Sequence, residues 1–160
     1  MGNRKIRNNI LILAVCTIFG WIVLNNIYLY TPFNFTSDKV TRGDWYWYKN
    51  PVTINISQYN KENKVEEITI SDKLEVKMFL KELKMGKEIQ NYQVPTSIKL
   101  DEQYFVVLLS GNSVLFSAIG ITKDNVLALN HINSEAVSIQ LTESLKGYIS
   151  KKLSQTKSVQ

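Results

Sequence analysis

Tyr104-Phe-Val-Val-Leu-Leu109 is apolar at every position, and after the turn-forming pair Gly111-Asn112 a second apolar run, Val114-Leu-Phe-Ser-Ala-Ile119, follows. The first run has apolar side chains on both faces of an extended chain, which is typical of a central strand covered on both sides. The glycine and asparagine between the runs predict a tight turn, after which the second run returns antiparallel to the first. We therefore expect this hairpin to lie in the middle of a sheet.

Shorter extended segments lie before and after the hairpin. In residues 52–57, Val52, Ile54 and Ile56 alternate with polar residues, which is the period-two pattern of a half-buried strand. The stretch 87–96 is predicted to be a polar connection. Further strands are predicted over 65–70, 126–129 and 136–141.

Two amphipathic helices are predicted. Asp72 and Glu75 have the spacing of a capping box, which satisfies free N–H groups at the start of a helix. Gly86 is a natural end for this helix, and Thr142 caps the second one. The first helix has an apolar stripe at helical spacing, formed by Val76, Phe79, Leu80 and Leu83. The second has a similar stripe, formed by Leu145, Tyr148, Ile149 and Leu153.

The predicted order is β-β-α-β-β-β-β-α, which places the chain in the α+β class. We expect one small domain, residues 45–154, with a mostly antiparallel sheet and both helices packed on it. Residues 31–44 contain turn-forming residues without periodicity and are predicted to be a tether. The polar tail, residues 155–160, is expected to fray.

An uninterrupted apolar run, residues 10–24, precedes the tether. Extended to residues 10–30, it would measure about 31 Å as a helix, which is enough to span a bilayer. The N-terminal segment, residues 1–9, is kept in the cytoplasm by the positive-inside rule because it carries Arg4, Lys5 and Arg7. The sequence therefore predicts a single-pass transmembrane signal-anchor helix, with the C-terminal domain outside the cell.

The apolar run has three alternative interpretations. A cleaved signal peptide needs small residues just after the run, and residues 25–30 offer none. A lipoprotein signal would place Cys16 at the cut, but Val15 is bulky there and the apolar run continues beyond Cys16. A buried core helix would need a polar face, whereas this run is apolar on every side.

The composition excludes several classes of protein. The 160 residues include one cysteine and one histidine, which rules out an intramolecular disulfide and the usual zinc sites. Of the net charge of +5, three positive charges precede the apolar run, so the remainder carries only +2 and nucleic-acid binding is not expected. No cofactor and no metal site is predicted, and the oligomeric state is left open.

No catalytic motif is found in the sequence. His131 has no nucleophile motif near it, and the neighbouring carboxylates Asp101-Glu102 and Glu66-Glu67 would point to opposite faces of an extended chain. The lysines of residues 73–87 are interleaved with acidic residues, which is typical of a solvated helix face. Contact of these lysines with anionic lipid or a cell-wall polymer is the alternative.

Trp45, Tyr46, Trp47 and Tyr48 form the candidate contact surface. In an extended chain, Trp45 and Trp47 would share one face, and the two tyrosines the other. We expect one face of this run to be structural and the other to be available to a partner, a glycan or the membrane surface.

Some of these pieces resemble known domains. Ile54-Asn55-Ile56, Ile68-Thr69-Ile70-Ser71-Asp72 and the lysine-rich helix up to Lys84 resemble small exported or lipid-anchored domains of unknown function from Bacillus and related low-GC Gram-positive bacteria. The resemblance covers residues 52–153. It implies a location outside the cytoplasm and no known chemistry, and the chain departs from the lipid-anchored members by keeping an uninterrupted membrane span.

Two functions are compatible with these features. The first is a membrane-anchored, non-enzymatic interaction or sensing module at the cell envelope. Its partners would be the lipid bilayer, through residues 10–30, and an envelope protein or polymer. The second is a hydrolase or transferase that acts on envelope substrates through an unrecognised site. The lack of a motif that gathers histidine, cysteine or carboxylates favours the first.

Overall fold

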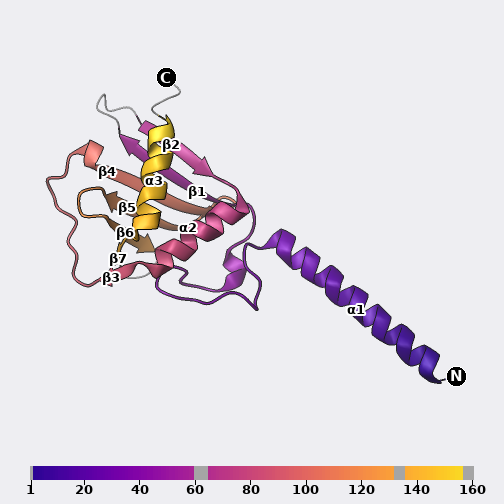
Figure 1. Cartoon of the computed structure of the whole chain (residues 1–160). Coiled ribbons are helices and arrows are strands. Elements are labelled where there is room, and N and C mark those ends of the chain that lie inside the picture. Colours follow the sequence, from indigo (N-terminus) through magenta and orange to yellow (C-terminus); the bar gives the residue numbers. More distant parts are fainter. Residues whose placement is uncertain (1, 60–64, 132–135, 157–160) are drawn as a thin grey trace.

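The computed structural model describes residues 2–59, 65–131 and 136–156 of the chain. Figure 1 shows a long helix, α1 (Gly2–Ile27), that projects from a domain in which two further helices lie across one face of a sheet. The other regular elements are β1 (Val52–Tyr59), β2 (Val65–Ile70), α2 (Lys73–Met85), β3 (Lys87–Ile89), β4 (Gln103–Ser110), β5 (Ser113–Ile121), β6 (Val126–His131), β7 (Val137–Gln140) and α3 (Glu143–Thr156). Two short 3₁₀ turns, η1 (Trp45–Trp47) and η2 (Leu100–Glu102), complete the described part.

Seven strands form one sheet in the described residues, in the order β2-β1-β4-β5-β6-β7-β3. Every neighbouring pair is antiparallel. The β4–β5 hairpin lies in the middle, as predicted, and Gly111 in its turn has a φ of +57°, a conformation that favours glycine. The α+β class with an antiparallel sheet is therefore confirmed.

The helices α2 and α3 cover one face of this sheet. Ile54, Leu108 and Phe116 lie side by side in the strand register and point toward the helices. The predicted stripe of α2 is fully buried against this face: Val76, Phe79, Leu80 and Leu83. Burial of these stripes is the main source of stability for the domain.

The predicted cap of α2 forms only in part. Asp72 Oδ1 accepts hydrogen bonds from the N–H groups of Leu74 and Glu75, both at 2.9 Å. The Glu75 carboxylate does not complete a capping box. Instead it accepts from Lys152 Nζ at 3.1 Å and from the Tyr148 hydroxyl at 3.2 Å, and so joins α2 to α3.

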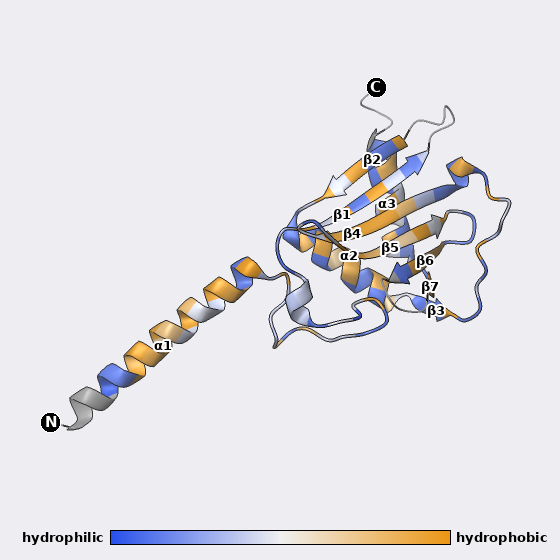
Figure 2. Cartoon of the chain, turned by 180° about the vertical axis from the view of Figure 1, so that it is seen from behind, coloured by the Kyte–Doolittle hydropathy of each residue, from blue (hydrophilic) through white to orange (hydrophobic). Residues whose placement is uncertain are grey.

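Among the described residues, no helix lies over the opposite face of the sheet. Phe105, Val107 and Ile119 point to this face and are half-buried, and Figure 2 shows apolar residues along β4 and β5 from this side. The central place of β4 was predicted correctly, whereas the expected cover on both sides is present only on the helical side among the described residues. The apolar side chains on this second face are therefore half-buried by side chains of the neighbouring strands, and not by a second layer of helices.

Two expectations about local structure were wrong. β3 lies in the stretch predicted to be a polar connection, and pairs with β7 at the edge of the sheet. Three residues are too few to show an alternating pattern. Trp45–Trp47 form a 3₁₀ turn and not an extended segment, since the N–H groups of Trp47 and Tyr48 donate to the carbonyls of Asp44 and Trp45.

The helix α1 ends at Ile27, three residues before the predicted end at Tyr30. Tyr28 forms an isolated antiparallel bridge with Lys49, and Leu29 is buried in the domain. Residues 31–44, expected to be a tether, also pack into the domain, where the side chains of Thr31, Val40 and Thr41 are buried.

Candidate functional site

The helix α1 contains a segment, Arg7–Ile27, that is long and apolar enough to cross a membrane. Its mean hydropathy is 2.2, and none of its most apolar window is buried by the rest of the chain. Cys16 is exposed on this helix. An apolar surface of this extent calls for lipid or another protein to cover it.

The C-terminal end of α1 is bound directly to the domain. The Ile27 carbonyl accepts from the Asn50 N–H at 2.8 Å, and the Leu29 N–H donates to the Tyr48 carbonyl at 2.8 Å. Lys73 Nζ, at the start of α2, donates to the carbonyls of Asn25 and Tyr28. Its positive charge also suits the negative end of the dipole of α1. Burial, together with the nearby Lys77 ammonium, lowers the pKa of Lys73.

The segment just after α1 is held by a turn around Asp38. Asp38 Oδ1 accepts from the N–H groups of Val40 and Thr41, both at 2.8 Å, and Lys84 Nζ lies 3.4 Å from Oδ2. Burial opposes ionisation of Asp38, but the hydrogen bonds from Thr41 and Val40 and the charge of Lys84 outweigh it and lower its pKa. The turn therefore satisfies the polar groups of Thr41 although this residue is fully buried.

Three aromatic rings pack beside this turn. Tyr30 lies 5.4 Å from Phe35 and 5.5 Å from Tyr48, measured between ring centroids. Lys84 Nζ sits 5.5 Å from the centroid of the Tyr30 ring. Burial, with a smaller contribution from the Asp38 charge, raises the pKa of Tyr30 to about 12. These rings close the small core that joins residues 28–51 to the rest of the domain.

A second group of aromatic side chains faces outward around the end of α1, and we call it the aromatic collar: Trp21, Tyr28, Phe33, Trp45, Tyr46 and Trp47. Phe33 is 83% exposed and its ring lies 5.9 Å from that of Trp21 on α1. Tyr28 and Trp45 are in edge contact at 4.8 Å. The collar therefore lies next to the last turns of the apolar helix and contacts it through Phe33.

The four residues of the candidate contact surface are divided between these two groups. Tyr48 is only 2% exposed and belongs to the core, whereas Tyr46 and Trp47 are 46% and 52% exposed. Trp45 is half-buried against Tyr28. The Trp47 ring lies against Gly43, where an added Cβ would approach it to 2.7 Å. The 3₁₀ turn thus replaces the expected alternation of tryptophans and tyrosines.

The sequence interpretation missed Trp21 and Phe33 as members of this surface. Phe33 stands in a polar, turn-rich stretch just after the apolar run. An apolar ring in such a place was a usable signal, because it has no regular element to bury it.

An open hollow of about 630 Å³ lies next to the collar. Tyr46 and Trp47 form one side, and the β4–β5 turn with Val114 and Leu115 forms the other. Ser110 lies between them, and its hydroxyl exchanges hydrogen bonds of 2.9 Å with the backbone N–H and C=O of Lys49. The hollow offers aromatic, apolar, hydroxyl and amide surface together with the cationic Lys49, and no carboxylate is among its lining residues.

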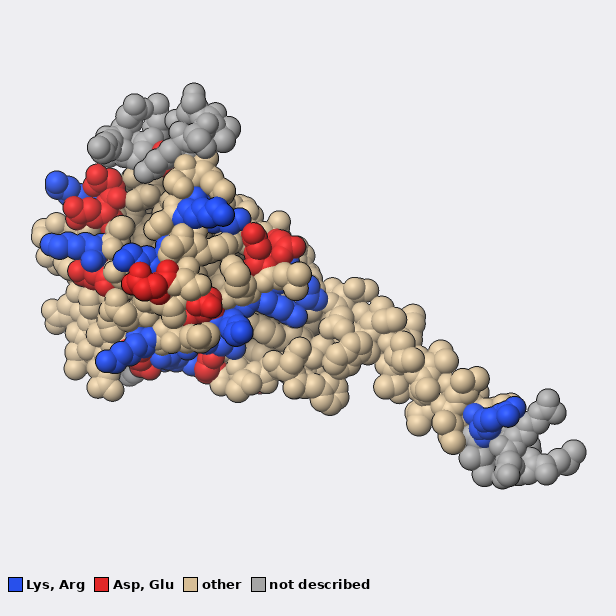
Figure 3. Space-filling view, in the orientation of Figure 1, with Lys and Arg blue, Asp and Glu red and all other residues tan. Residues whose placement is uncertain are grey.

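The lysines of α2 share the surface with acidic residues, as Figure 3 shows on the helical side. Lys73 and Lys84 are engaged at the junction, as described above, whereas Lys81 of α2 and Lys87 at the start of β3 are exposed. Among the described residues, no group of three histidine, cysteine or acidic side chains could hold a metal ion. Asp101 and Glu102 lie in η2, and the side chain of His131 lies outside the described part.

Comparison with protein-family models, with curated proteins and with solved structures finds no match for this chain. The resemblance drawn from residues 52–153 therefore stays a hypothesis. The function has to be inferred from the geometry of the junction and of the domain.

Proposed function

We propose that this chain is a single-pass membrane protein whose domain lies outside the cytoplasm and acts as a non-enzymatic interaction or sensing module at the cell envelope. In this proposal α1 crosses the bilayer, and the domain rests on the outer surface. The aromatic collar lies at the outer boundary of the bilayer, with Trp21 on the lipid side and Trp45–Trp47 nearer the headgroups, and the hollow beside it is the surface offered to an envelope protein or polymer.

The observation that carries the proposal is the direct attachment of the domain to the end of an exposed apolar helix. The hydrogen bonds of Asn50, Leu29 and Lys73 leave no free linker between the helix and the domain. A domain held in this way cannot move far from the membrane that its helix crosses.

The depth of the collar fits the same arrangement. Trp21 lies about 9 Å of helix before Ile27, and Phe33 reaches back from the domain to contact it. Tryptophan and tyrosine prefer the boundary between lipid and water, where the ring is in an apolar layer and the polar group is hydrated. In this proposal the collar, with Tyr28 among its members, supplies the aromatic belt at the outer boundary of the membrane.

Tryptophan fluorescence tests the membrane contact, because all three tryptophans of the chain belong to the collar. The full chain is placed in vesicles that contain lipids brominated at different depths. Trp21→Phe leaves Trp45 and Trp47 as reporters, and the double variant Trp45→Phe/Trp47→Phe leaves Trp21. We expect bromine near the headgroups to quench Trp45 and Trp47, and bromine further down the acyl chains to quench Trp21. Quenching of Trp21 alone would mean that the domain stands away from the bilayer.

A fusion tests the orientation. A reporter enzyme that is active only outside the cytoplasm, attached after Gln160, is expected to be active, because the basic residues precede the apolar run. The mature protein should keep the mass of the uncleaved chain. Activity confined to a cytoplasmic reporter would reverse the orientation, and a mass that lacks residues 1–30 would show a signal peptide.

Site-specific crosslinking tests the interaction. A photo-reactive residue in place of Val114, in the hollow beside the collar, should capture an envelope component in intact membranes. The variant Trp47→Ala should reduce that yield, whereas a photo-reactive residue in place of the exposed Lys151 on α3 is the control. Equal yields at both positions would contradict the assignment of the hollow.

A further inference from the structure

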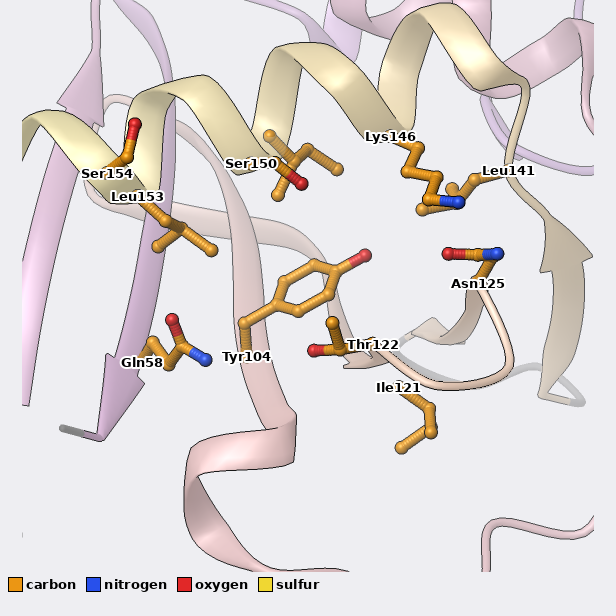
Figure 4. Close-up of a pocket in the computed structure, with 11 residues that line it drawn as sticks. Gln58, Tyr104, Ile121, Thr122, Asn125, Leu141, Lys146, Ser150, Leu153 and Ser154 are labelled. Atoms are coloured by element: carbon orange, nitrogen blue, oxygen red, sulfur yellow. The ribbon is translucent and has the colours of Figure 1, made fainter. Parts of the chain in front are cut away.

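A second, more enclosed hollow lies between α3 and the sheet. Its volume is about 250 Å³, roughly the space of eight water molecules in the liquid. Its walls are largely apolar, through Ile121, Leu141, Ile149 and Leu153. Figure 4 shows how side chains from α3, from β4 and from the β5–β6 turn converge on it.

Tyr104 of β4 presents a polar group to this hollow. The residue is only 4% exposed, and its ring lies over Gly120 of β5, where an added Cβ would approach the ring to 2.0 Å. Its hydroxyl points into the hollow toward Asn125 and Lys146 and has no hydrogen-bond partner among the described residues. Burial raises the pKa of Tyr104, so the hydroxyl stays protonated and can donate a hydrogen bond. The hydroxyl is not one of the fully enclosed polar atoms, so water in the hollow can accept its bond, and the acceptor of a ligand can replace that water.

Lys146 and Asn125 add two further polar groups to the wall. One orientation of the Asn125 amide satisfies both of its ends. In it, the amide nitrogen donates to the Thr122 carbonyl at 3.2 Å, and the amide oxygen accepts from Lys146 Nζ at 3.2 Å. The other partner of Lys146 is Glu143, at 3.7 Å, whose side chain is 86% exposed. The side chain of Lys146 is itself 42% exposed, so its positive charge is partly hydrated and its counterion is screened by solvent.

The chemistry of the wall selects the class of ligand. No carboxylate is among the lining residues, so an ammonium ligand would meet only the like charge of Lys146. An apolar body fits the aliphatic walls, and an acceptor with a negative charge fits the donors of Tyr104 and Lys146. We propose that this hollow binds a small organic anion, with a compact apolar body and one carboxylate or phosphate group held by Tyr104 and Lys146.

Ligand-detected fluorine NMR tests this site with a set of small probes that share a fluorinated ring and differ in charge. The anionic probes are 4-fluorobenzoate and 4-fluorophenyl phosphate, with 4-fluorobenzyl alcohol and 4-fluorobenzylamine as the neutral and cationic counterparts. The full chain is used in phosphatidylcholine nanodiscs, and empty nanodiscs correct for partition into lipid. We expect one or both anions to bind, and the preferred one identifies the anionic group. The alcohol and the amine should bind much more weakly.

Two variants locate the binding. Lys146→Met and Tyr104→Phe should each weaken binding of the anion about tenfold or more, the range for a hydrogen bond to a charged group. Lys151→Met, on the exposed side of the same helix, should leave the affinity unchanged. Tyr104→Phe should melt close to the parent chain, since it keeps the buried ring and removes only a hydroxyl that faces the hollow, so lost binding is not lost folding.

Three results would overturn the inference. These are no binding of either anion up to millimolar concentration, equal affinity of the alcohol and the anions, or unchanged affinity in Lys146→Met. None of them bears on the contact of the collar with the membrane, which is tested separately.

Discussion

Residues 28–51 and the body of the domain, residues 52–153, bury their side chains by different means. The body stacks the stripes of α2 and α3 on a seven-stranded sheet, and most of its described backbone lies in strands and helices, which pair their own N–H and C=O groups. Residues 28–51 contain only one 3₁₀ turn and one isolated bridge, yet Leu29, Val40 and Tyr48 are at most 2% exposed. Here single side chains accept hydrogen bonds from the backbone: Asp38 accepts from the N–H groups of Val40 and Thr41, and Ser110 accepts from the N–H group of Lys49.

This difference predicts how the stability of each region responds to substitution. A packed layer depends on apolar volume and tolerates no buried charge, whereas an irregular segment depends on a few polar groups. Four substitutions, taken from the largest expected effect to the smallest, test this contrast.

Leu80→Asp should unfold the body of the domain. Leu80 has no exposed surface on α2, and a buried, unpaired carboxylate costs several kcal/mol, comparable with the roughly 5–15 kcal/mol that stabilise a whole domain. Lys81→Asp, at the exposed neighbouring position, is the matched control and should be nearly neutral. Circular dichroism during thermal unfolding measures both, and equal melting of the two variants would refute the burial of this stripe.

Tyr48→Ala should remove about 3–5 kcal/mol from the free energy of unfolding, because it empties the small core beside Tyr30 and Phe35. Trp47→Ala, one residue earlier, should cost under about 1 kcal/mol, because half of that side chain is already exposed. A similar loss for both would show that the aromatic run is not divided between core and surface.

Asp38→Asn should cost about 1–2 kcal/mol at neutral pH, because the amide can still accept from Val40 and Thr41 but no longer pairs with Lys84. The pKa of Asp38 is lowered from 3.8 in the folded chain. Its contribution is therefore complete above that pH and is lost as the pH falls below it. Melting of the parent chain should decline more steeply with acid than melting of Asp38→Asn. Asp101→Asn, at an exposed position, is the control, and parallel pH profiles for the parent and Asp38→Asn would contradict the role of Asp38.

Lys73→Met should have the smallest effect, about 1 kcal/mol, because it removes the donor to the carbonyls of Asn25 and Tyr28 but keeps the aliphatic stem. Lys81→Met, in the same helix but away from α1, should have no effect. Hydrogen exchange at the N–H groups of Leu29 and Asn50 gives a local readout of the junction. Unchanged exchange in Lys73→Met would show that the lysine does not support the end of α1.

The regular elements were predictable because each repeats a pattern over many residues. The stripe that begins at Val76, the alternation at Ile54 and Ile56, and the apolar run of α1 each show themselves within one segment. The short strand β3 could not be found in this way, because its three residues are a strand only by virtue of their pairing with β7.

The site was less accessible to sequence reasoning. The burial of Thr31 and Thr41 is possible only because Asn34 and Asp38 nearby accept their hydrogen bonds, and the same residues could equally form an exposed loop. The enclosed hollow depends on the strand register that places Tyr104 beside Gly120. Lys146 lies in a helix more than forty positions after Tyr104, and no local sequence pattern predicts that the two residues line the same hollow.

The attachment of α1 has a mechanical consequence. Because Asn50 and Lys73 donate hydrogen bonds to the last carbonyls of α1, the domain and the helix rotate together as one rigid body. The apolar part, Ile10–Ile27, is about 27 Å long, slightly less than an average hydrocarbon layer. A thinner bilayer tilts such a helix and a thicker one draws it upright. If α1 crosses a bilayer as proposed, changes in the thickness of that bilayer would tilt the sheet relative to the membrane plane, and the direction in which the uncovered face of the sheet points would follow the thickness of the membrane.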